Sequence, residues 1–283
     1  MSGNSSNIIA YSYFGGKNTF LPYLYEEFPT DFVHLVDLFA GSLAVSLNYN
    51  TRSVIKTANE INGDITNFFQ VLRDNYDEFI DKLLLTPVSE QEFINCWEQS
   101  TDKIEQARRF YVRQRQSFMS MGAQKQSKGW MMAKTRINCR VGESVSKWNN
   151  AIPKLADVVN VIRQNFQIMN HDYAKCIDKT DFDKAFFYVD PPYPANCRAS
   201  KNDYKFEFFD EHHEHLAEKL HNIQGYAMIS SYENKLYEKL YSDWRKVKLP
   251  IKKNNIRSSE VEEIIWMNYA KPTNTTLTLF NYE

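Results

Sequence analysis

The sequence has little of what marks fibrous, disordered or membrane-spanning proteins. Its 283 residues include only nine Gly and nine Pro, whereas 43% are hydrophobic and 14% are aromatic. Collagen-like repeats and disordered chains are excluded, since the former need far more glycine and the latter lack the apolar residues of a core. No apolar run approaches the roughly 18 residues of a membrane span. We therefore expect one large domain with an insertion, folded around a sizeable core.

Cysteines are also few. Cys96, Cys139, Cys176 and Cys197 are scattered and form no Cys-x-x-Cys pair. The residues before Lys17 include no lysine or arginine and no long apolar stretch, so they do not resemble a secretory signal. Four cysteines are compatible with disulfides, but reduced thiols in a cytoplasmic protein are the favoured interpretation.

The net charge is only −1, with 34 basic and 35 acidic residues, which argues against a general nucleic-acid coat protein. The charge is unevenly distributed, however. Residues 103–140 hold ten basic residues against Glu105 alone, a net charge of +9 that leaves −10 on the remainder. A second stretch, 245–257, has six basic residues and no acidic one. The first stretch also contains aromatic residues, a mixture that suits nucleic acid; a solvated helix face is the alternative.

Apolar periodicity predicts an α/β fold. Strands are expected at 32–39 and 54–58, a short helix from 43 to 48, and a long amphipathic helix at 65–85. Helices are then expected at 89–99 and 102–118, followed by an irregular hairpin or loop at 119–145. Later strands are expected at 167–171, 185–189, 226–230, 247–251, 262–268 and 275–280, with helices at 158–164, 211–223 and 234–241. We interpret 1–85 and 151–283 as one body, interrupted by an inserted segment at 86–150.

The tetrapeptide Asp190-Pro191-Pro192-Tyr193 directly follows the apolar strand expected at 185–189. Ligands of open α/β sheets bind at the carboxyl ends of strands, so a reactive group is expected here. Two prolines fix the backbone and remove two N–H donors. A carboxylate and a rigid carbonyl together could accept the two hydrogens of an exocyclic amino group, with an aromatic ring beside the base.

With its flanking motifs, this tetrapeptide resembles the catalytic motif of the Dam-like DNA adenine-N6 methyltransferases (D12 class, α arrangement). Phe14-Gly15-Gly16-Lys17 and the segment 37–42, Asp-Leu-Phe-Ala-Gly-Ser, stand in the order of that family. The segments 59–64, 232–234 and 263–268 also agree with the family. The resemblance implies a Rossmann-like doubly wound, mostly parallel sheet of the class I S-adenosylmethionine-dependent methyltransferases. The insert at 86–150 would be a mainly helical target-recognition domain that carries a hairpin or loop.

The resemblance also implies roles for individual residues. Asp190, Pro191, Pro192 and Tyr193 would be catalytic, with Tyr193 stacking on a flipped-out adenine. The S-adenosylmethionine site would comprise Tyr13, Phe14, Gly15, Gly16, Lys17, Asp37, Phe39, Ala40, Gly41, Glu60, Asp172, Tyr173 and Asp190. Glu60 would accept hydrogen bonds from the ribose hydroxyls, and Asp172 from the adenine amino group. Two departures from the family are Leu43, where a second glycine is frequent, and Ser12, where some relatives have a DNA-contacting lysine.

The implied partner is double-stranded DNA. The DNA-binding residues would be Arg109, Arg113, Arg115, Lys125, Lys128, Lys134, Arg136 and Arg198. The resemblance implies a bacterial or phage-encoded protein, monomeric or weakly dimeric, with a cognate restriction endonuclease as a conceivable genetic partner.

No metal site is expected, because the histidines at 212–215 lack His-x-x-x-His spacing. An RNA adenine methyltransferase, a DNA-binding protein without turnover, and a protein-glutamine methyltransferase (normally with Asn in place of Asp190) remain alternatives, and the recognition sequence stays open.

Overall fold

A computed structural model describes residues 7–13, 15–51, 53–117, 129–138, 140–197, 205–250 and 262–271. Their centre is a seven-stranded sheet in the order β5, β2, β1, β6, β7, β9, β8. The strands in that order are Phe166–Met169, Ile55–Asn59, His34–Asp37, Ala185–Val189, Tyr226–Tyr232, Glu263–Met267 and Arg245–Lys248. The first five are parallel, and β9 runs antiparallel to both of its neighbours. The predicted mostly parallel sheet is confirmed.

Both faces of this sheet are buried, which explains the continuous apolar runs in the sequence. All five residues of β6 are buried. Phe187 and Val189 pack on one face with α9 (Tyr173–Thr180) and α10 (Asp210–His221). Phe186 and Tyr188 pack on the opposite face with α1 (Leu21–Glu26). β6 thus lies at the centre of the sheet, and the residue that follows it enters the middle of the carboxyl edge.

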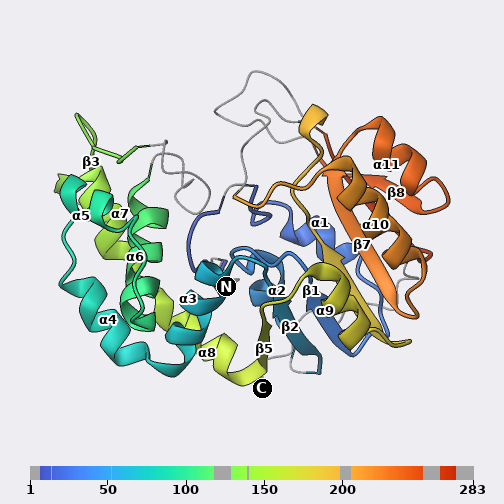
Figure 1. Ribbon diagram of the computed structural model, residues 1–283, viewed down its shortest axis with the longest axis horizontal. Coiled ribbons are helices and arrows are strands. Elements are labelled where there is room, and N and C mark those ends of the chain that lie inside the picture. The colour runs from blue at the N-terminus through green and yellow to red at the C-terminus, as the bar shows by residue number, and fades with distance from the viewer. Residues whose placement is uncertain are drawn as a thin grey trace, which may run out of the picture.

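Apart from α1 and the short helix α2 (Ala44–Asn48), the helices form two groups that lie apart in Figure 1. One group comprises α9, α10 and α11 (Lys235–Leu240). The other comprises α3 (Gly63–Asp74), α4 (Tyr76–Leu84), α5 (Glu90–Asn95), α6 (Lys103–Gln116), α7 (Glu143–Ala151) and α8 (Leu155–Asn165). Within the described ranges, no helix has the length and apolar character needed to cross a membrane.

The single long helix predicted at 65–85 is wrong: the segment forms two helices, α3 and α4. Asn75 ends the first helix and begins the second, with backbone angles of φ −128° and ψ 38° that lie outside the helical region. Asparagine favours such breaks because its amide competes for backbone hydrogen bonds. The apolar spacing continues across the break because both helices bury residues in the same core.

Other elements were missed or shifted for local reasons. Helix α1 is too short for a periodic pattern, and helices α7 and α9 follow segments expected to be irregular or extended. Helix α2 (Ala44–Asn48) and a short hairpin of β3 (Ile137–Asn138) and β4 (Val141–Gly142) lie where they were predicted. The strand predicted at 275–280 lies outside the described residues. Cys96, Cys176 and Cys197 are free thiols, as predicted, whereas Cys139 is not described.

The segment predicted as an insert packs closely on α3. Tyr111 of α6 stacks on Phe68 of α3 with ring centroids 5.6 Å apart. Arg113 pairs with Asp64 across the same helices at 3.0 Å. α6 therefore shares one hydrophobic core with α3, α4 and α8. The boundary at residues 86–150 remains a prediction, because the packing does not separate this segment from its neighbours.

Close packing at the start of β7 gives a test of the fold. A Cβ on Gly225 would lie 2.4 Å from the carbonyl oxygen of Ala185 and 2.8 Å from that of Phe182. Both contacts are with backbone, so Gly225→Ala should lower the free energy of unfolding by about 2 to 3 kcal/mol. Gly63→Ala is the matched control, because its Cβ would meet nothing within 4 Å. The control should be neutral or stabilising by about 0.5 kcal/mol in urea titrations; equal effects for both variants would contradict the packing.

Candidate active site

Asp190 lies at the carboxyl end of β6 and is held by two side chains. The Lys17 ammonium lies 2.8 Å from each carboxylate oxygen of Asp190. The Ser230 hydroxyl of β7 donates to Oδ1 at 2.9 Å. The side chain of Lys17 is 4% exposed and that of Asp190 is 21% exposed. The structure thus brings together Lys17 and Asp190, which come from two motifs far apart in the sequence.

A second carboxylate, Glu263, completes this cluster. It opens strand β9 and lies 3.1 Å from the Lys17 nitrogen. The Tyr193 hydroxyl donates to Glu263 and accepts from Lys17 at 2.8 Å. The Tyr193 ring packs edge-on against Tyr232, with centroids 4.7 Å apart. Sequence reasoning did not assign Glu263 to the site; the available signal was an acidic residue at the start of an otherwise apolar strand.

Opposing charges set the protonation of this cluster. Burial by itself lowers the pKa of Lys17, but Asp190 and Glu263 outweigh burial and raise that pKa well above its usual value. Lys17 therefore remains an ammonium ion. Burial raises the pKa of Glu263, and the charge of Lys17 opposes that rise. Burial also raises the pKa of Tyr193 well above its usual value, aided by Asp190 and Glu263, so its phenol stays protonated.

The turn after β1 is fixed from two sides. The Tyr11 hydroxyl donates to the carbonyl of Gly41 at 2.9 Å, and the Gly41 N–H donates to Glu60 at 3.0 Å. Gly41 has φ +49°, and a Cβ there would lie 3.0 Å from the Tyr13 ring. The predicted residues Tyr13, Gly41 and Glu60 therefore lie together. Leu43 also adopts a left-handed conformation, at φ 58°, where the family often has glycine.

Glu60 keeps some acceptor capacity. One of its oxygens accepts from Gly41, and the other accepts from the N–H of Asn62 at 3.0 Å. Because each carboxylate oxygen offers about two lone-pair sites, both can accept a further hydrogen bond. Glu60 therefore has the capacity required by its predicted role toward hydroxyl groups.

Asp37, at the end of β1, is a buried acid beneath this turn. Its side chain accepts from the Ser46 hydroxyl at 2.6 Å. Burial, only partly opposed by that hydrogen bond, raises the pKa of Asp37 to about 7. The nearby charges of Asp190 and Glu60 contribute to the rise. Asp37 is thus a buried support of the turn at the carboxyl edge.

The dipeptide Asp172-Tyr173 begins helix α9. Asp172 accepts from the N–H of Ala174 at 2.9 Å and so caps the helix. The Tyr173 ring stacks on Phe39, with centroids 5.9 Å apart, and its hydroxyl bonds His215 of α10 at 2.8 Å. The structure therefore packs Phe39 against Tyr173, and the assignment of these two residues to a cofactor stays a prediction.

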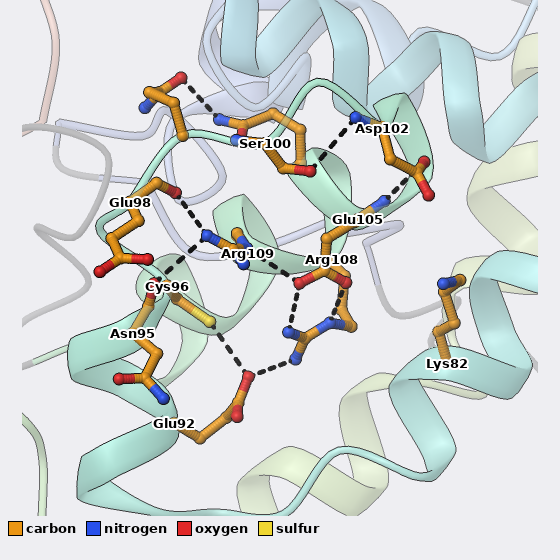
Figure 2. A network of polar contacts seen from close by, with 12 residues as sticks. Lys82, Glu92, Asn95, Cys96, Glu98, Ser100, Asp102, Glu105, Arg108 and Arg109 are labelled. Carbon is orange, nitrogen blue, oxygen red and sulfur yellow. Dashed lines mark hydrogen bonds and ion pairs between the residues drawn. The ribbon is translucent and has the colours of Figure 1, made fainter.

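The predicted DNA-binding arginines of α6 are engaged within the protein. Arg108 and Arg109 both turn toward Glu105, as Figure 2 shows, and Arg109 also donates to the carbonyl of Glu98 at 2.9 Å. The hydrogen bond from Arg108 is the main cause that lowers the pKa of Glu105 to about 2. Arg113 is 3% exposed and paired with Asp64. An interior guanidinium cannot reach a phosphate, so the prediction that Arg113 contacts DNA is not supported.

Lys134 and Arg136, beside the β3–β4 hairpin, are exposed. Arg115 is half-buried and donates to the carbonyl of Lys147 at 3.0 Å. Phe14, Lys125, Lys128 and Arg198 lie outside the described residues.

The second basic stretch is partly neutralised where it is described. Arg245 pairs with Glu27 at 2.6 Å, and Lys248 pairs with Glu262 at 2.6 Å. Lys246 pairs with Glu233 and Glu238. The described basic residues of this stretch therefore form ion pairs with acidic residues of the same chain.

The family model for D12 class N6 adenine-specific DNA methyltransferases matches residues 13–257. The match includes the Lys17 segment, the β1 turn and the tetrapeptide at 190–193, but ends before Glu263.

The buried carboxyl of Asp37 predicts a pH-dependent stability. Its pKa in the folded protein, about 7, lies above the value of about 3.9 in an unfolded chain. The folded state therefore binds the proton more tightly, and the resulting stability is present below pH 4 and lost as pH rises through 7. The free energy of unfolding of the wild type relative to Asp37→Asn should fall by up to about 4 kcal/mol between pH 4 and 8. Urea titrations of both proteins across this range test this, and parallel pH curves would contradict it.

Proposed function

The chain belongs to the D12 class of N6 adenine-specific DNA methyltransferases, and from this we propose which residues carry the reaction. The protein is an enzyme that methylates adenine in DNA site-specifically. Methyltransferases of this kind generally use S-adenosylmethionine. The observation that carries the assignment of the site is the placement of Asp190, at the carboxyl end of the central strand, among Lys17, Ser230 and Tyr193.

The residues around the β1 turn fit S-adenosylmethionine. Gly41 leaves the space that a Cβ would fill against Tyr13, and Glu60 has acceptor sites for ribose hydroxyls. Phe39 and Tyr173 offer an aromatic surface for an adenine ring. When bound, S-adenosylmethionine supplies a methyl group made electrophilic by its sulfonium.

The protein's own contribution is to position the target amine. The N6 lone pair of adenine is delocalised into its ring, so the nitrogen is a weak nucleophile. Asp190 and the carbonyl of Pro191 accept the two amino hydrogens and orient the nitrogen as it pyramidalises. Catalysis on this scheme consists of positioning and electrostatic stabilisation.

The target atom lies inside the duplex, so the proposal includes extrusion of the adenine. Tyr193 is the residue proposed to contact the flipped base. Its ring is 6% exposed and its hydroxyl is held by Lys17 and Glu263. Stacking on the base therefore requires the groups around Tyr193 to move.

Asp190→Ala tests the assignment of the catalytic carboxylate. DNA from a methylation-free bacterial host that expresses the wild type should carry N6-methyladenine in a fixed sequence context, read by single-molecule sequencing. In the purified variant kcat should fall by at least about 100-fold, since a directed acceptor is lost. Full activity in the variant would overturn the role of Asp190. Methylation of RNA but not DNA by the wild type would overturn the substrate.

Arg136→Gln and Arg113→Gln form a matched pair for the DNA surface. Arg136 is exposed, so its loss should weaken DNA binding, reduce the salt slope of the affinity by about one, and leave stability within about 0.5 kcal/mol. Arg113 is buried against Asp64, so its loss should lower the free energy of unfolding by about 3 kcal/mol. For both variants, filter binding at several salt concentrations measures the DNA affinity and its salt slope, and urea titration measures the free energy of unfolding. If Arg113→Gln strongly weakens DNA binding but leaves the free energy of unfolding unchanged, the assignment of Arg113 to the interior and of Arg136 to the DNA surface is contradicted.

A further inference from the structure

The Lys17 ammonium is surrounded by more acceptors than it can satisfy. Both oxygens of Asp190 and the hydroxyl of Tyr193 lie 2.8 Å away. Glu263 lies at 3.1 Å and the carbonyl of Gly15 at 3.2 Å. An ammonium group has three N–H donors. Five oxygens therefore compete for three hydrogens, and a small displacement can move the charge from one carboxylate to the other.

The ammonium beside Asp190 works against the proposed role of this carboxylate. Oδ1 already accepts from Ser230 and Lys17, and Oδ2 accepts from Lys17. With about two lone-pair sites for each oxygen, Oδ1 is filled, and only Oδ2 can accept the one amino hydrogen that the role requires. The attacking nitrogen also becomes more positive during methyl transfer, and an ammonium bonded to the same carboxylate would oppose that charge. A productive complex is favoured when Lys17 releases at least one oxygen of Asp190.

Glu263 offers Lys17 an alternative partner at almost no change in position. Its carboxylate is 6% exposed and comes from β9, whereas Asp190 follows β6. Tyr193 already connects them, because its hydroxyl accepts from Lys17 and donates to Glu263. A displaced ammonium would thus keep a charged partner in the interior, which avoids the penalty of an unpaired buried cation.

We propose that Glu263 is a positioning residue that takes over the Lys17 ammonium when the target amino group binds Asp190. The inference rests on the proposed role of Asp190 as the acceptor of that group. Glu263 touches neither DNA nor cofactor in this scheme and acts through Lys17. Its charge, and not only its shape, is required.

Glu263→Gln tests the charge while keeping the shape of the side chain. The substrate is genomic DNA from a methylation-free host, and kcat and KM are measured from methyl incorporation. We expect kcat to fall at least about tenfold, with the Kd for S-adenosylmethionine changing less than about threefold. Glu262→Gln is the matched control, because Glu262 pairs with Lys248 at the surface; it should keep wild-type kinetics. Wild-type kcat in Glu263→Gln would overturn the proposal.

A double-mutant cycle separates this role from a structural one. Lys17→Met and Lys17→Met with Glu263→Gln are compared in the same assay. If Glu263 acts through Lys17, adding Glu263→Gln to Lys17→Met should cost no more than about twofold in kcat. If the fold-losses in kcat of the two single variants multiply in the double variant, the proposal is overturned. Glu263→Asp, which keeps the charge, should recover part of the kcat lost in Glu263→Gln, and equal kcat in these two variants would count against it.

The activities of the wild type and of Asp190→Ala distinguish a failure of the role of Glu263 from a failure of the role of Asp190. If the wild type produces N6-methyladenine but Glu263→Gln matches it, only the role of Glu263 fails. If Asp190→Ala retains full activity, the role of Asp190 as acceptor fails first, and the role of Glu263 fails with it.

Discussion

A single buried ammonium connects the parts of the chain that form the site. Lys17 comes from the N-terminal segment, Asp190 follows the central strand β6, and Glu263 opens β9. A buried cation is stable only when it is paired, so these three segments must come together for the interior to be electrostatically neutralised. Asp190 and Glu263 together keep Lys17 protonated despite its burial. The requirement for pairing thus also orders the Asp190 carboxylate.

The same edge of the sheet also organises the turns after β1 and β2. Parallel strands β1, β2 and β6 end together, so Asp37, Glu60 and Asp190 lie near one another. Hydrogen bonds from Gly41 and Asn62 to Glu60 link the turn after β1 to the turn after β2. These hydrogen bonds give the turn a defined shape, and its glycine leaves room beside Tyr13. Preorganisation of this kind lowers the entropic cost of binding.

Much of this arrangement was predictable because it depends on local patterns. The buried strand β6 and the carboxylate that follows it were predicted from an unbroken apolar run and the rule that ligands bind at carboxyl edges. The grouping of Lys17 and Asp190 in one site came from the family resemblance. The division of α3 from α4 was missed because a continuous apolar stripe hides a break at one asparagine. The burial of Arg113 was missed because a basic run gives no sign of which member faces Asp64.

The sequence by itself determined the α/β class, the mostly parallel sheet and the position of Asp190 at the end of a buried strand, because strand periodicity and strand ends are local properties of the chain. Only the tertiary structure decided which charges meet. Glu263 enters the site because β9 runs antiparallel beside β7 and presents its first residue to the carboxyl edge of the parallel strands. Likewise, Arg113 of α6 becomes an interior group paired with Asp64 only when that helix packs on α3. Ion pairing in a protein interior depends on distances between segments far apart in sequence, and no local pattern encodes those distances.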